Sequence, residues 1–151
     1  MNPVRPWLYV GKFVDTLDGS TLSAQGIGAV LQLAHSVQHP GITSCFIPVD
    51  DGVPLPGDLL RQGVDFVLDA KRRGQRVLIA CGAGISRSVT FAVAALKEDE
   101  GLSLSEAVQT VKRNHPDSSP HPALWDSLCA YYGEPVPVHA MLRALRTSSS
   151  A

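Results

Sequence analysis

The segment from 76 to 96 limits what this chain can fold into more than any other. It opens with a compact apolar run, 76–80, that is typical of a buried strand, and continues through a glycine-rich loop, 81–86. Beyond the loop, apolar residues recur at helical spacing from Val89 to Leu96. A strand that passes through such a loop into a helix is typical of a parallel sheet covered by helices. Functional sites of such sheets lie at the carboxyl ends of the strands, so we expect this loop to be functional.

The rest of the chain repeats this alternation of short apolar runs and helical spacing. The expected strands are 7–10, 27–33 and 45–49, and the expected helices lie within 15–25, 56–73, 104–113 and 124–131. Ser103 and Glu106 form the capping-box pattern that opens the third of these helices, and Pro48 requires an edge strand or a strand end. This order predicts an α/β fold with a central, mostly parallel sheet flanked by helices.

The length of 151 residues fits one domain that buries its own core. We expect this domain to span 1–135. The remaining 136–151 form a tail with at most one short turn of helix at 141–145 and a frayed end from Thr147.

Charge and cysteine usage exclude several classes of protein. With 13 basic and 14 acidic side chains the formal net charge is −1, which argues against a general nucleic-acid binder. Cys45, Cys81 and Cys129 form no CxxC pair, so neither a disulfide framework nor a zinc site is indicated. No run approaches the ~18 apolar residues of a membrane span. We therefore expect a monomeric, cytoplasmic protein that has no metal or cofactor and does not bind membranes.

Cys81 stands where the expected strand becomes the glycine-rich loop. Backbone N–H groups of such a loop, together with the helix N-terminus that follows, attract an oxyanion and favour a thiolate over a thiol. Gly82 and Gly84 allow close approach of the backbone, and Arg87 can reach back to grip two oxygens of a phosphate. Ser88 adds a hydroxyl that can donate to the sulfur.

The run Cys81-Gly82-Ala83-Gly84-Ile85-Ser86-Arg87-Ser88 resembles the C-x5-R-S signature of the cysteine-dependent dual-specificity phosphatases. Similar to that family are also the opening Trp7–Gly11, the Ile47–Asp51 segment 30 positions before the cysteine, and the 104–113 helix with the proline-bearing turn after it. The resemblance covers roughly 5–132 and implies the protein tyrosine phosphatase-like fold.

The resemblance implies a role for each residue of the signature. Cys81 would attack phosphorus to form a phosphocysteine, Arg87 would hold the phosphate, and Ser88 would assist the leaving sulfur. Asp51 would act as general acid and base, with Asp50 as its competitor. Loop residues 82–86 (Gly82, Ala83, Gly84, Ile85 and Ser86) would bind the substrate phosphate. The implied substrate is a phosphoprotein or phosphopeptide carrying phosphotyrosine, phosphoserine or phosphothreonine.

Two positions depart from the family pattern. Relatives usually have histidine immediately before the cysteine, where this chain has Ala80, so we expect a less readily ionised thiol and an altered pH dependence. In the turn 116–122, relatives often have asparagine after a proline, where this chain has His121. His121 either supplies a supporting hydrogen bond there or is an ordinary surface histidine. The other histidines (His35, His39, His115 and His139) show no ligand-like spacing, and we expect them at the surface or in loops.

Two other functions remain open from the residues. The alternative to a phosphatase is a phosphate-binding pseudophosphatase module with weak or no turnover, because Ala80 replaces the histidine. A thiolate beside an arginine-closed anion loop also suits a sulfur-transfer or arsenate-reducing enzyme, although Cys45 and Cys129 lie at no suggestive spacing for the latter.

Overall fold

The computed structural model describes residues 1–149 and contains a central sheet of five strands. The strands are β1 (Asn2–Arg5), β2 (Leu8–Lys12), β3 (Ile27–Gln32), β4 (Thr43–Phe46) and β5 (Arg76–Cys81). Their order across the sheet is β1-β2-β5-β3-β4. Neighbouring strands from β2 to β4 run parallel, and β1 alone pairs antiparallel, with β2. The expected α/β fold with a mostly parallel sheet is confirmed.

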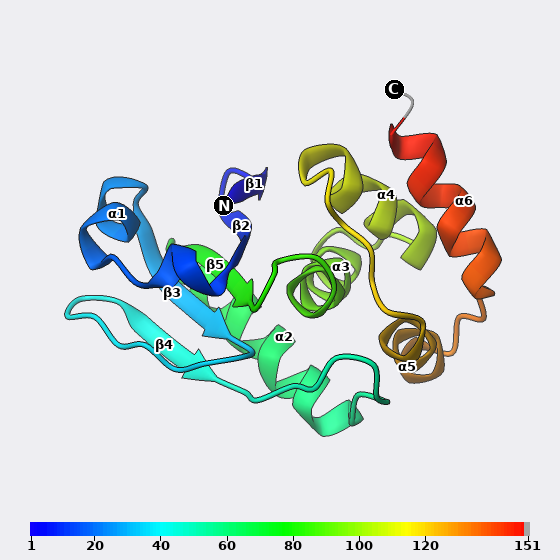
Figure 1. The fold of residues 1–151 in the computed structure, drawn as a ribbon, viewed down its shortest axis with the longest axis horizontal. Coiled ribbons are helices and arrows are strands. Elements are labelled where there is room, and N and C mark those ends of the chain that lie inside the picture. Colours follow the sequence, from blue (N-terminus) through cyan, green and yellow to red (C-terminus); the bar gives the residue numbers. More distant parts are fainter. Residues whose placement is uncertain (150–151) are drawn as a thin grey trace.

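Helices cover both faces of the sheet, but unequally (Figure 1). They are the 3-10 helix η1 (Phe13–Thr16) and the α-helices α1 (Gly19–Ala24), α2 (Gly57–Arg72), α3 (Arg87–Glu100), α4 (Leu104–Asn114), α5 (Pro122–Tyr132) and α6 (Val138–Ser149). The larger apolar core lies between the sheet and helices α2 to α6, whereas a small cluster lies under α1. Cys81 faces the larger core and Ala80 faces the smaller cluster, because successive side chains of a strand point to opposite faces.

Local signals in the sequence explain where several elements begin and end. Ser103 Oγ accepts from the N–H of Glu106 at 3.1 Å, and the Glu106 carboxylate accepts from the N–H of Ser103 at 3.0 Å, so the expected capping box opens α4. β4 is an edge strand that ends at Phe46, before Pro48, as the missing N–H of proline requires.

Two strands differ from the sequence expectation. Strand β1 was not expected, and the strand expected at 45–49 lies instead at Thr43–Phe46. The one short helix expected within 15–25 is confirmed as α1, which Asp18 caps by accepting from the N–H of Ser20; the 3-10 helix η1 before it was not expected.

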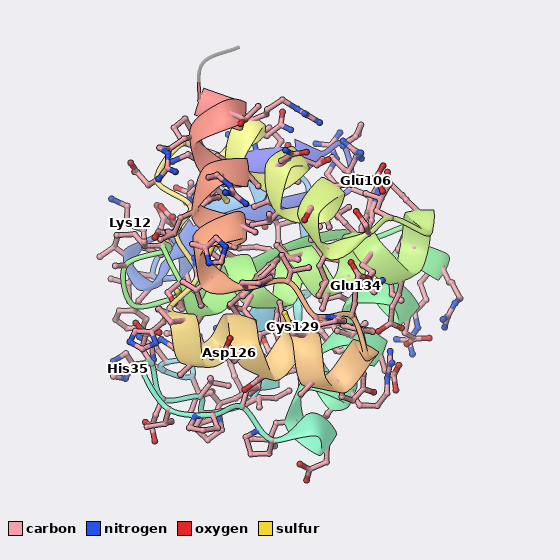
Figure 2. The ribbon with its side chains drawn as sticks, turned by 90° about the vertical axis from the view of Figure 1, so that its right-hand side faces the viewer. Lys12, His35, Glu106, Asp126, Cys129 and Glu134 are labelled. Carbon is pink, nitrogen blue, oxygen red and sulfur yellow. The ribbon has the colours of Figure 1, made fainter. Side chains whose placement is uncertain are left out.

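Helix α6 is much longer than the single turn expected at 141–145. It runs to Ser149, through the first part of the end expected to fray, while Ser150 and Ala151 lie outside the described residues. Its Met141 is completely buried in the main core. In Figure 2 this helix stands near the viewer, above α5 and beside α4. Across residues 1–149, no helix has both the length and the apolar character needed to cross a membrane.

Candidate active site

The loop between β5 and α3, residues 82–86, begins directly after Cys81 and ends directly before Arg87, as the sequence predicts. It bends through Gly84, whose φ is +69°, a conformation that residues with a side chain rarely adopt. A Cβ at Gly84 would lie 2.9 Å from the carbonyl oxygen of Gly11, on the neighbouring strand β2. Glycine is therefore required here both by conformation and by space.

Cys81 is nearly inaccessible, with 2% of its surface exposed, and its sulfur faces Ser88 in the first turn of α3. The thiol donates to Ser88 Oγ at 3.2 Å, and the N–H of Ser88 donates to the sulfur at 3.4 Å. In the thiolate form the hydroxyl becomes the donor, because the sulfur then has no proton. Ser88 can thus stabilise negative charge on the sulfur.

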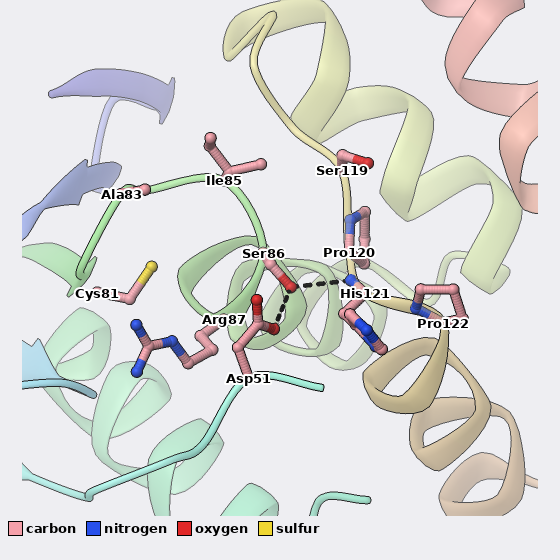
Figure 3. Close-up of a pocket in the computed structure, with 10 residues that line it drawn as sticks. All are labelled: Asp51, Cys81, Ala83, Ile85, Ser86, Arg87, Ser119, Pro120, His121 and Pro122. Atoms are coloured by element: carbon pink, nitrogen blue, oxygen red, sulfur yellow. Dashed lines mark hydrogen bonds between the residues drawn. The ribbon is translucent and has the colours of Figure 1, made fainter. Parts of the chain in front are cut away.

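Arg87 reaches back from the start of α3 toward the loop. Its Nη1 donates to the carbonyl oxygen of Val49 at 2.8 Å, which fixes the guanidinium against the segment that carries the two aspartates. A Cβ on Gly82 would meet Nη2 at 3.0 Å, so the absent side chain at Gly82 leaves room for the arginine. Thiol and guanidinium lie close together at one end of the site (Figure 3).

Asp51 and Asp50 have different surroundings although they are adjacent in sequence. Ser86 Oγ donates to the Asp51 carboxylate at 2.8 Å and itself accepts from the N–H of His121 at 2.8 Å (Figure 3). Asp51 lines the same pocket as Cys81, whereas Asp50 lines a separate pocket beside Val53 and Leu59. The geometry therefore brings Asp51, and not Asp50, to the cysteine pocket.

The pocket has a volume of about 320 Å³, enough for a phosphate and part of its substituent. Its lining includes six of the predicted site residues: Asp51, Cys81, Ala83, Ile85, Ser86 and Arg87. Gly82, Gly84 and Ser88 do not line it. The segment before and into α5 forms its other side, with Ser119, Pro120, His121 and Pro122. Of these four residues, the sequence had drawn attention only to His121.

His121 combines parts of both interpretations left open for it. Its backbone N–H supplies the supporting hydrogen bond to Ser86, and its exposed imidazole Nδ1 accepts from the N–H of Ala123, which caps α5. The hydrogen bond to Ser86 therefore does not depend on the type of side chain at position 121.

His115 was expected at the surface or in a loop, and it lies in the loop that follows α4, although it is buried there. The residue is 7% exposed and its Nε2 lies 2.5 Å from the carbonyl oxygen of Gly84 in the loop. Its position 31 residues further along the chain gave no signal of this contact, because the pairing depends on how α4 packs against the loop.

The other two thiols have surroundings unlike that of Cys81. Burial raises the pKa of Cys45 and of Cys129, so both stay protonated at neutral pH and are poor nucleophiles. Among the side chains that the structure describes, no three His, Cys, Asp or Glu gather in a way that could hold a metal ion. The site places a thiol, a guanidinium and a carboxylate around one pocket. This arrangement suits attack on a phosphate ester.

Comparison with known proteins gives matches over most of the chain. The family model for the dual specificity phosphatase catalytic domain matches residues 8–134. Mouse dual specificity protein phosphatase 15 is 30% identical over 131 residues, covering 85% of this chain and 56% of that protein. Human dual specificity protein phosphatase 16 is 37% identical over 130 residues, covering 80% of this chain and 19% of that protein. The chain thus spans about half the length of the mouse relative.

Solved structures are similar as well. The crystal structure of human DUSP28 superimposes with a TM-score of 0.82 at 27% identity, covering 88% of this chain and 96% of that chain. These likenesses confirm the resemblance seen in the sequence. The family model and the two relatives are described as dual specificity phosphatases, so the comparisons do not favour the pseudophosphatase alternative.

Proposed function

Because the chain belongs to the dual specificity phosphatase family, we propose that it is a protein phosphatase that works through a phosphocysteine intermediate. The observation that supports this most directly is the arrangement of Cys81, Arg87 and Asp51 around one pocket at the carboxyl end of β5. Each of the three supplies a different requirement of phosphate ester cleavage.

In the first step the Cys81 thiolate attacks phosphorus, and the bond from phosphorus to the ester oxygen breaks. Asp51 gives its proton to the departing oxygen, so the alcohol or phenol leaves neutral. Arg87 and the loop N–H groups hold the three remaining phosphoryl oxygens, on which charge is spread in the transition state.

In the second step a water attacks the phosphocysteine and Asp51, now a carboxylate, takes a proton from it. The bond between phosphorus and sulfur breaks, inorganic phosphate forms, and the electron pair returns to the sulfur. Ser88 donates to that sulfur and makes it a better leaving group, since its hydroxyl lies 3.2 Å away. Thiolate, guanidinium and backbone dipoles provide the charge stabilisation of both steps without a metal.

The walls of the pocket suggest the class of substrate. Ala83, Ile85, Pro120 and Pro122 line it with apolar surface, and none of its lining residues is a lysine. Ile85 is 40% exposed at the rim, where it can contact an aromatic ring or a neighbouring peptide side chain. These features suit phosphotyrosine, with phosphoserine and phosphothreonine as further substrates, in a phosphoprotein or phosphopeptide.

The thiol chemistry also bears on where the enzyme works. A catalytic thiolate needs a reducing compartment, and the three cysteines are all free. We place the enzyme in the cytoplasm as a monomer, without nucleic-acid or membrane partners.

Steady-state hydrolysis of a chromogenic aryl phosphate across pH, without added metal, tests the proposal by comparing the unmodified protein with Cys81→Ser. The serine variant should lose turnover, because a hydroxyl is a far weaker nucleophile than a thiolate over the pH range of the assay. Cys45→Ser is the matched control and should keep turnover, since that thiol lies on the edge strand β4.

Equal turnover in the protein and its Cys81→Ser variant would exclude the phosphocysteine mechanism. Absence of turnover in the unmodified protein, with binding of a phosphate analogue retained, would favour the phosphate-binding module instead.

A further inference from the structure

The outer side of the phosphate-binding loop is held by hydrogen bonds to its carbonyl groups. The N–H of Phe13 donates to Gly82 O at 3.4 Å, and the N–H of Ser119 donates to Ile85 O at 2.9 Å. The third bond comes from a side chain, because His115 Nε2 donates to Gly84 O at 2.5 Å. Within the described chain, His115 is the only side chain that donates to a carbonyl of residues 82–85.

The direction of these carbonyls decides the direction of the N–H groups that follow them. In a planar trans peptide, the carbonyl and the next N–H point to opposite sides. His115 lies outside the pocket lining, so turning Gly84 O toward it turns the N–H of Ile85 toward the pocket. In the same way, the hydrogen bond from Ser119 to Ile85 O turns the N–H of Ser86 toward the pocket. The inward N–H groups are the ones that can bind an oxyanion.

The surroundings of His115 fix which ring nitrogen carries the proton. Asn2 Nδ2, on β1, donates to His115 Nδ1 at 2.7 Å, so that nitrogen is an acceptor and the proton lies on Nε2. The residue caps the end of α4, and Ser118 Oγ donates to its carbonyl at 2.6 Å. Backbone and ring are therefore held in one orientation, with the donor aimed at the loop.

The residue immediately before Cys81 has no polar side chain that could hold the loop. Ala80 is 3% exposed and its methyl lies in the small apolar cluster on the opposite face of the sheet. Asp51 holds the loop through Ser86 Oγ, but side-chain support for the carbonyls of residues 82–85 depends on His115.

We propose that His115 is a positioning residue, which keeps the N–H of Ile85 directed into the pocket by holding the carbonyl of Gly84. The inference rests on the proposed function for its catalytic consequence, but its effect on oxyanion binding does not require turnover. Losing the donor lets the Gly84–Ile85 peptide rotate, so a smaller fraction of the protein has the loop ready to bind.

The test compares His115→Gln, whose amide can still donate to Gly84 O, with His115→Met, which has similar length and no donor. His139→Met, at an exposed position on α6, is the matched control. Tungstate is the probe, with its Kd measured by calorimetry, and each variant is also assayed for kcat/KM and Tm.

We expect His115→Met to weaken tungstate binding and kcat/KM by about tenfold, the effect of one lost buried hydrogen bond. His115→Gln should recover most of this loss, and His139→Met should behave as the unmodified protein. A merely structural role would lower Tm in both His115 variants without separating their affinities for tungstate. Equal weakening in the Met and Gln variants, or weakening in neither, would overturn the proposal.

A second measurement avoids any failure of the variants to fold. Nitrogen NMR of histidine rings in the unmodified protein should show His115 with its proton on Nε2 and none on Nδ1 near pH 8. A proton on Nδ1 alone would remove the donor to Gly84 and overturn the proposal. Normal tungstate binding without turnover would instead count against the proposed phosphatase activity and leave the role of His115 intact.

Discussion

Asp50 and Asp51 are equivalent as acids in the sequence but differ in the contacts of their side chains. Ser86 donates to Asp51 and is itself held by the N–H of His121, so the carboxylate is aimed by a chain of two hydrogen bonds. Asp50 faces the apolar surroundings of a different pocket. A general acid must reach the leaving oxygen, and only Asp51 lies on the pocket that contains the cysteine.

Exchanging each aspartate for asparagine should therefore have unequal effects. Asp51→Asn should lower kcat for a phosphoserine peptide by roughly 10²–10⁴-fold, the usual contribution of a positioned acid. The loss should be smaller for an aryl phosphate, whose phenol leaves more readily without a proton. Asp50→Asn is the control, and the assignment fails if this variant is the more damaged of the two.

Site residues that lie close together in the sequence could be predicted from it. Residues that packing brings to the site could not. Cys81, Arg87 and Ser88 belong to a single strand–loop–helix unit, whose local geometry already places thiol, guanidinium and hydroxyl near one another. His115 and Ser119 reach the loop only after α4 has packed beside it, so no local pattern marked them. The position of Asp51 came from the family resemblance, because spacing alone did not separate it from Asp50.

Among the elements, Glu134 connects three helices on the main face of the sheet. It follows the end of α5, and its carboxylate accepts from Lys97 Nζ on α3 and from the N–H of Leu104 at the start of α4, both at 2.7 Å. Partial burial tends to raise the pKa of Glu134, but these donors outweigh it and hold the pKa below its ordinary value. The charged form therefore stabilises the fold (Figure 2 shows its place).

Glu134→Gln should lower the free energy of unfolding by about 1 kcal/mol at pH 7, since the amide keeps the shape but loses the charge. Because the folded pKa is depressed, this contribution is present above the unfolded pKa and is lost as the pH falls through the folded value. Urea unfolding at several pH values should show the two proteins converging in acid. Asp126→Asn, at an exposed position of α5, is the control; a constant difference at all pH values would contradict the assignment.

The spacing of apolar residues predicted the helices that bury one regular face. It failed where pairing between strands sets the position or the ends of an element. Helices α2, α3 and α4 were found because their apolar residues recur at helical spacing over several turns. Strand β1 was missed because its four residues include Pro3 and show no apolar alternation; its place is fixed by pairing with β2. β4 begins earlier than expected because its register with β3 decides its length.

At the scale of the whole molecule, the question is whether the chain after Gly133 belongs to the folded domain. The sequence predicts a domain that ends at 135, yet the indole N–H of Trp125 donates to the carbonyl of Val136 at 2.8 Å. Helix α6 then packs along α4, and its Met141 is fully buried in the main core. None of its residues lines the active-site pocket. This arrangement suggests that α6 stabilises the domain and leaves the chemistry unchanged.

Met141→Ala tests whether α6 belongs to the folded domain and stabilises it. Leu142→Ala, at the exposed neighbouring position, is the control. Removing a fully buried methionine side chain should cost about 3 kcal/mol, from lost apolar burial and the cavity left behind. Leu142, which is 40% exposed, should cost less than about 0.5 kcal/mol. Urea unfolding measures both, and kcat/KM should be unchanged in each variant where it is folded. Equal, small costs would mean that α6 adds little to stability and that a domain ending at 135 is the better description.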